Sequence, residues 1–103
     1  MMYEEEYKVQ ITKQAEFQKL VEDFGKMVKE LKLPFLKDWY VVQNKYVPGH
    51  VREVWVLEEQ ANVDKMWELA MGHPEFMKYP PKFFEIMVDG SYESSFWAKI
   101  ATL

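Results

Sequence analysis

Hydrophobic and polar positions follow two different periods along the chain, and each change of period marks a predicted element. In residues 7–11, YKVQI, apolar and polar side chains alternate strictly, as in a strand with one buried face. Between residues 13 and 32 the apolar positions recur at steps of three and four, which predicts an amphipathic helix. Thr12 is the expected N-cap, and Pro34 prevents further helix.

The middle of the chain predicts a β-hairpin. Residues 36–47 and 51–59 are rich in β-branched and aromatic side chains, and they flank Pro48-Gly49-His50. Two such runs around a turn sequence are typical of paired antiparallel strands.

Two helical pieces and a strand are predicted in the last third. Asn62 is the expected N-cap of a short helix, and Gly72 stands where a left-handed residue often ends one. A further helical piece is predicted to begin at Pro81 and to end before a turn at Asp89-Gly90. Residues 91–103 then read as the last strand.

The resulting β-α-β-β-α-β order predicts one ferredoxin-like α+β domain over residues 1–103, with a four-stranded antiparallel sheet and helices on one face. The later strands are apolar on both faces: Trp55 and Leu57 alternate with Val54 and Val56. Helices can cover only one face, and a bare apolar sheet is too large a patch for a monomer. A homodimer, closed into a dimeric α+β barrel, is therefore expected, and scattered partial exposure is the alternative.

Composition narrows the classes of partner. The chain of 103 residues is 49% hydrophobic and 17% aromatic, with a net charge of −4 and no basic cluster, so no nucleic-acid partner is expected. The absence of Cys excludes disulfides and thiolate chemistry. No apolar run is long enough to span a membrane, and the start MMYEEEYK does not resemble a signal peptide. We expect a cytoplasmic protein with no membrane partner.

The stretch REVWVLEEQANVDKMWELAMGHPEFMKY resembles a known group of proteins. Together with the order of elements it is similar to the dimeric α+β barrel superfamily and, within that, to NIPSNAP-like proteins, which pair a Trp-containing strand with a helix that ends in a Pro-acidic-aromatic motif. Here Val54-Trp55 and Pro74-Glu75-Phe76 correspond to these features. The resemblance implies a fold shared by cofactor-free monooxygenases, haem-degrading monooxygenases, isomerases and proteins of unknown function.

The pattern of the haem-degrading members is incomplete here. They resemble one another in an Asn on the first strand and a Trp and a His further on, whereas this chain has Gln10 and a His73 that follows Trp67 by six residues. No cofactor is therefore expected, and haem stays as an alternative in which His73 would be the axial ligand.

The aromatic excess predicts a small-molecule site. The ligand is expected to be small and apolar or aromatic, bound between sheet and helices. The candidate ligand-binding residues are Tyr7, Trp39, Trp55, Trp67, His73, Phe76 and Tyr79. The other interpretation of these side chains, and of the methionines near them, is ordinary core.

Catalytic groups are scarce in the sequence. His73 is a candidate general base, with a surface or capping histidine as the alternative. His50 lies in the predicted turn, and two distant histidines without a thiolate predict no metal site. Neighbours among Glu4, Glu5 and Glu6 point to opposite faces of a strand, so they are not expected to form a dyad. The function is therefore either small-molecule binding, with monooxygenation as one activity, or a non-catalytic assembly module with a filled core.

Overall fold

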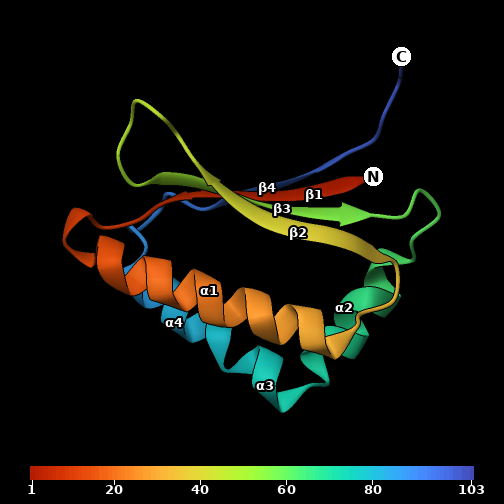
Figure 1. The fold of residues 1–103 in the computed structure, drawn as a ribbon, viewed down its shortest axis with the longest axis horizontal. Helices are drawn as coiled ribbons and strands as arrows, with labels where there is room; N and C mark the ends of the chain where they lie inside the picture. The colour runs from red at the N-terminus through yellow and green to blue at the C-terminus, as the bar shows by residue number, and fades with distance from the viewer.

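The computed structural model describes all residues from 1 to 103 (Figure 1). The elements in chain order are β1 (Met2–Lys8), the 3-10 turn η1 (Ile11–Lys13), α1 (Gln14–Leu31), β2 (Leu36–Gln43), β3 (His50–Leu57), α2 (Val63–Met71), α3 (Pro74–Met77), α4 (Tyr79–Ile86) and β4 (Glu93–Trp97).

The four strands form one antiparallel sheet in the order β2-β3-β1-β4. All helices lie on the same side of this sheet (Figure 1). The predicted ferredoxin-like α+β fold is confirmed, and so is the hairpin of β2 and β3. Because β1 and β3 are the two central strands, side chains on their helix-facing side lie in the middle of the molecule.

The first strand begins and ends earlier than the sequence predicted. β1 runs from Met2 to Lys8 and pairs along its length with β3, whereas Ile11 lies in η1 and is 70% exposed. Tyr7 and Val9 are buried as predicted. The error arose because a run of three glutamates looks like a solvated strand end, while a long partner strand can extend the pairing across it.

Several helix ends differ from prediction. Thr12 makes no cap, because it lies inside η1 and the helix proper begins at Gln14. Asn62 does cap α2, accepting a hydrogen bond from the Lys65 backbone N–H at 3.0 Å. Gly72 is right-handed, with φ of −75°, so the predicted left-handed end is wrong. α4 begins at Tyr79 and not at Pro81, since the first turn of a helix tolerates residues without an N–H.

The last strand is shorter than predicted. β4 covers Glu93–Trp97 only, and beyond it the chain leaves the sheet on the side away from the helices (Figure 1). Ile100 and Leu103 are fully exposed. They contribute nothing to either face of the sheet in this chain, because no neighbouring strand extends far enough to pair with them.

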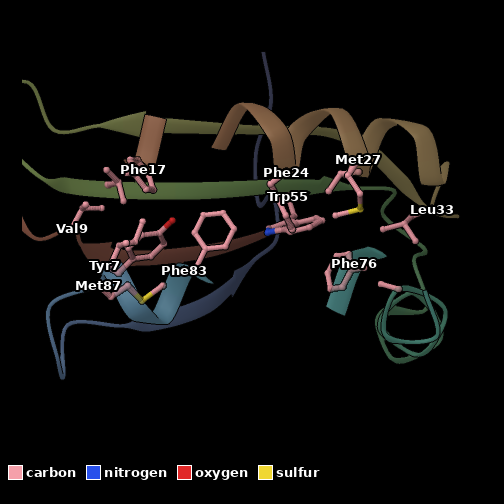
Figure 2. Close-up of a cluster of buried hydrophobic side chains, with 14 of the residues drawn as sticks. Tyr7, Val9, Phe17, Phe24, Met27, Leu33, Trp55, Phe76, Phe83 and Met87 are labelled. Atoms are coloured by element: carbon pink, nitrogen blue, oxygen red, sulfur yellow. The ribbon is translucent and has the colours of Figure 1, made fainter. Parts of the chain in front are cut away.

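An aromatic core fills much of the space between sheet and helices. Figure 2 shows the rings of Phe24, Trp55, Phe76 and Phe83 gathered in one layer. Phe24 is at the centre, with ring centroids of Trp55 at 5.9 Å and Phe83 at 5.3 Å in edge-to-face geometry, which aromatic pairs prefer. Gly25 lets α1 approach the sheet, because a Cβ there would lie 2.8 Å from the Trp39 ring.

The face of the sheet away from the helices is mixed in character. Its apolar side chains are Met2, Tyr40, Val42, Val54, Val56 and Trp97. Glu4, Glu6 and Arg52 lie among them, so this face is less uniformly apolar than the sequence suggested.

None of the helices is long and apolar enough to cross a membrane.

Candidate functional site

A cavity of about 280 Å³ lies between the sheet and helices α2, α3 and α4. Aromatic and methionine side chains make up most of its wall. The lining residues are Tyr3, Glu5, Phe24, Glu53, Trp55, Trp67, Met71, Phe76, Met77, Pro80, Phe83, Phe84, Met87 and Tyr92. A largely apolar cavity with a few convergent polar groups is the usual form of a small-molecule site.

The charged groups of this cavity are two glutamates on neighbouring strands. Glu5 of β1 and Glu53 of β3 are direct partners in the sheet register, and both face the helices. Glu53 is only 4% exposed. Side chains directly opposite each other in an antiparallel pair have Cβ atoms about 4.5–5.5 Å apart. The two carboxyl groups therefore act on each other as a pair.

Each carboxyl group accepts hydrogen bonds from neutral donors. The Trp55 Nε1–H donates to Glu5 Oε1 at 2.8 Å, and the Tyr92 hydroxyl donates to Glu5 Oε2 at 2.6 Å. The Tyr7 hydroxyl donates to Glu53 Oε2 at 2.8 Å. The Trp39 indole N–H, which is buried and has no other hydrogen-bond partner, also acts on the Glu53 carboxyl group. Glu5 is thus held as an acceptor at both oxygens, whereas Glu53 accepts from Tyr7 at one oxygen and has the Trp39 indole as a neighbour.

The environment favours a proton on this pair. Burial, followed by the nearby negative charge of Glu5, raises the pKa of Glu53 to about 8, although hydrogen bonding by Tyr7 and the closeness of the Trp39 indole act in the other direction. Burial also raises the pKa of Glu5, against the lowering effect of its bonds to Tyr92 and Trp55. Glu53 therefore carries the proton at neutral pH, and Glu5 is better stabilised as the anion.

The two tyrosines that donate to the pair are held in the neutral form. Burial and the neighbouring glutamates raise the pKa of Tyr7 and of Tyr92 well above the usual range. The Tyr92 hydroxyl also shares a hydrogen bond of 3.3 Å with the hydroxyl of Tyr3. A hydrogen-bonded chain therefore runs from the Glu5 carboxylate through Tyr92 to Tyr3 at the cavity wall.

Sequence reasoning missed the glutamate pair. It compared neighbours within one strand, and such neighbours point to opposite faces, whereas this pair is formed by residues 48 positions apart. The available signal was the alternation of Tyr3, Glu5 and Tyr7, which places a carboxylate on the same face as two aromatic side chains.

The structure brings together some of the predicted ligand-binding residues. Trp55, Trp67 and Phe76 line the cavity. Tyr7 and Trp39 do not line the cavity. Both are neighbours of the Glu53 carboxyl group. Tyr79 packs on Phe24 at a centroid distance of 5.2 Å and also lies outside the lining. Binding by any of these side chains stays a prediction.

His73 lies at the N-cap of α3, in the extended conformation that the following proline favours. It is half-buried, is not among the lining residues, and makes no side-chain hydrogen bond. The predicted haem ligand therefore does not line the cavity, and haem binding stays a prediction. No group of three or more His, Asp or Glu side chains is arranged to hold a metal ion.

Solved structures with this fold include oxygenases. SnoaB from Streptomyces nogalater, a cofactor-independent oxygenase, is 12% identical over 99% of this chain and 94% of its own, with a TM-score of 0.75. An antibiotic biosynthesis monooxygenase is 9% identical over 97% and 98%, with a TM-score of 0.75. A NIPSNAP family protein from Agrobacterium tumefaciens is 18% identical over 91% and 80%, with a TM-score of 0.68.

These likenesses confirm the predicted resemblance to the ferredoxin-like α+β barrel proteins, NIPSNAP proteins among them, at the level of the fold. The sequence matches no model of a known protein family and none of the curated proteins. At such low identities the fold is shared while the site has to be read from its own residues.

Proposed function

We propose that this protein binds a small, flat, largely apolar molecule in the cavity between its sheet and α2, α3 and α4. The observation that carries the proposal is a pair of carboxyl groups, the buried Glu53 and the half-buried Glu5, in an otherwise largely aromatic wall. Apolar walls supply affinity, and the few polar groups orient the ligand. The cavity counts against the alternative of an assembly module with a side-chain-filled core.

A binding titration tests this function. We expect 2-naphthol, a neutral bicyclic aromatic, to quench the fluorescence of Trp55 and Trp67, since both line the cavity. Met71→Trp, which enlarges a side chain of the wall, is expected to weaken binding at least about 10-fold, because the ligand then loses its space. Leu69→Trp is the matched control, because Leu69 is on the same helix and does not line the cavity.

If 2-naphthol binds the Met71→Trp and Leu69→Trp proteins with equal affinity, it binds outside the cavity. Failure of 2-naphthol and of a panel of small aromatic molecules, neutral and charged, to bind the wild type would contradict the proposed function itself.

The pair also supports a second function, oxygenation without an added cofactor. A general base works best when its pKa lies near the working pH, and the pKa of Glu53 is about 8. Glu53 would remove a proton from a methylene carbon flanked by aromatic or carbonyl groups, and the resulting carbanion would reduce O2. The likeness to a cofactor-independent oxygenase agrees with this reaction.

The proposed oxygenation balances with dioxygen as the only co-reactant. One methylene compound and one O2 give one ketone and one water. The carbon exchanges its two C–H bonds for a C=O bond and so loses the four electrons that dioxygen gains. One oxygen atom stays on the carbon, and the other leaves as water with the two hydrogens.

A second copy of the chain is the proposed cover for the outer face of the sheet. Tyr40, Val42 and Trp97 are exposed on that face although they are large and apolar, and no element of this chain covers them (Figure 1). Glu4, Glu6 and Arg52 on the same face supply both signs of charge. A self-complementary contact about a two-fold axis uses such a mixed patch twice.

Light scattering after size exclusion tests the homodimer. The chain has a mass of 12.4 kDa, and we expect about twice this value across a tenfold range of concentration. Trp97→Glu is expected to give a monomer, because it places a charge in the apolar contact. Leu69→Glu, an equally drastic change on the helix layer, should leave the mass unchanged. A wild type that is monomeric throughout would rule out the barrel.

A further inference from the structure

The charge of the cavity has no counter-charge from the protein. Its lining residues include two glutamates but no Lys, Arg or His. Glu6 on the other face of the sheet, by contrast, has the charged side chain of Arg52 within 3.5 Å. A buried charge is normally paired with an opposite charge, and no Lys, Arg or His lines this cavity to provide one.

The groups that contact the pair are all neutral. Tyr7, Trp55 and Tyr92 each donate one hydrogen bond to it. These bonds satisfy both oxygens of Glu5 and one oxygen of Glu53, and the buried Trp39 indole is a further neutral donor beside Glu53. The site therefore holds a negative charge that no positive charge among its lining residues balances.

The walls around the pair suit a cation on an aromatic body. Trp55 and Trp67 pack edge to face at 5.2 Å, and Tyr3 packs on Trp67 at 5.5 Å. Aromatic faces within about 6 Å attract an ammonium group by their quadrupole. The same faces would stack on an aromatic ring further along the ligand.

We propose that the cavity selects a primary aryl-alkyl amine, whose ammonium group is held between Glu5 and Glu53 and whose ring lies among Trp55, Trp67 and Phe76. This inference rests on the proposed binding function and names the chemical class of its ligand. An anionic ligand of the same shape is excluded, because like charges at such a distance in a site with little water repel strongly.

Three probes of nearly equal shape test the selection. 2-Phenylethylamine, 2-phenylethanol and phenylacetate differ chiefly in their charge, and binding can be followed by NMR titration of the methionine methyl groups, since Met71, Met77 and Met87 line the cavity. We expect the amine to bind at least about 10-fold more tightly than the alcohol, and phenylacetate not to bind measurably. Glu53→Gln and Glu5→Gln should each reduce the preference for the amine to within a few-fold, while the exposed Glu58→Gln keeps it.

The outcomes separate this inference from the proposed function. If the alcohol or phenylacetate binds as tightly as the amine, the cation is not selected, although the cavity still binds aromatic molecules. If the preference for the amine survives in both Glu5→Gln and Glu53→Gln, the amine is recognised at another place and the inference is wrong. If none of these probes and no neutral aromatic binds, the proposed function fails with it.

Discussion

Replacing Glu53 by glutamine is expected to stabilise the protein at high pH. Glutamine keeps the shape of the side chain and an oxygen for the Tyr7 hydroxyl, but it has no proton to lose. At pH 9 wild-type Glu53 is ionised inside an apolar cavity, since its pKa in the folded protein is about 8. Removing that buried charge should raise the free energy of unfolding by at least about 2 kcal/mol.

The sign of the pH dependence follows from proton binding. In the unfolded chain the carboxyl group titrates near 4.5, and in the folded protein its pKa is about 8. Between these values the folded state holds the proton more tightly, so wild-type stability is greatest at low pH and decreases as pH rises through this window. The decrease amounts to up to about 5 kcal/mol, and Glu5 contributes in the same direction because its pKa is also raised.

Urea denaturation at several pH values between 4 and 9 measures the effect. Wild type should lose stability over the window, whereas Glu53→Gln should show a much flatter profile. The control is Glu58→Gln, an exposed glutamate just after β3, which should follow the wild-type profile. Parallel profiles for the wild type and Glu53→Gln would mean that Glu53 is solvated and ionised normally. The proposed role of Glu53 in the cavity would then be wrong.

The same substitution is expected to slow the proposed oxygenation strongly. With an activated methylene compound such as anthrone and an oxygen electrode, wild type should consume one O2 for each substrate molecule oxidised. Glu53→Gln should lower kcat/KM by at least about 100-fold, because a positioned general base contributes about 100- to 10,000-fold. For wild type, kcat/KM should rise with pH up to about 8, as the base becomes ionised.

Stability and activity then move in opposite directions in one variant. A variant that is more stable at pH 9 but oxygenates more slowly would show that the buried carboxyl group of Glu53 serves activity at the expense of stability. Unchanged activity in Glu53→Gln would remove Glu53 as the base. Wild type that consumes no O2 with any activated substrate would leave ligand binding as the function.

The local pattern of the chain determined the fold class. The periods of three and four in α1, the hairpin around Pro48-Gly49-His50 and the cap at Asn62 each depend on residues close together in sequence. Short-range sterics and hydrogen bonds decide such features, so they could be predicted without coordinates. The start of β1 could not, because the pairing of Glu4 to Glu6 depends on a strand almost fifty residues away.

The tertiary structure alone decided the site. Trp55, Trp67 and Phe76 could be nominated from aromatic content, but nothing local placed Glu5 opposite Glu53 or kept His73 away from the cavity. A shift of one residue in the register of β1 against β3 would turn Glu5 to the outer face. The periodicity of the chain therefore determined which elements form, whereas the long-range register of two central strands decided that two carboxyl groups share one cavity.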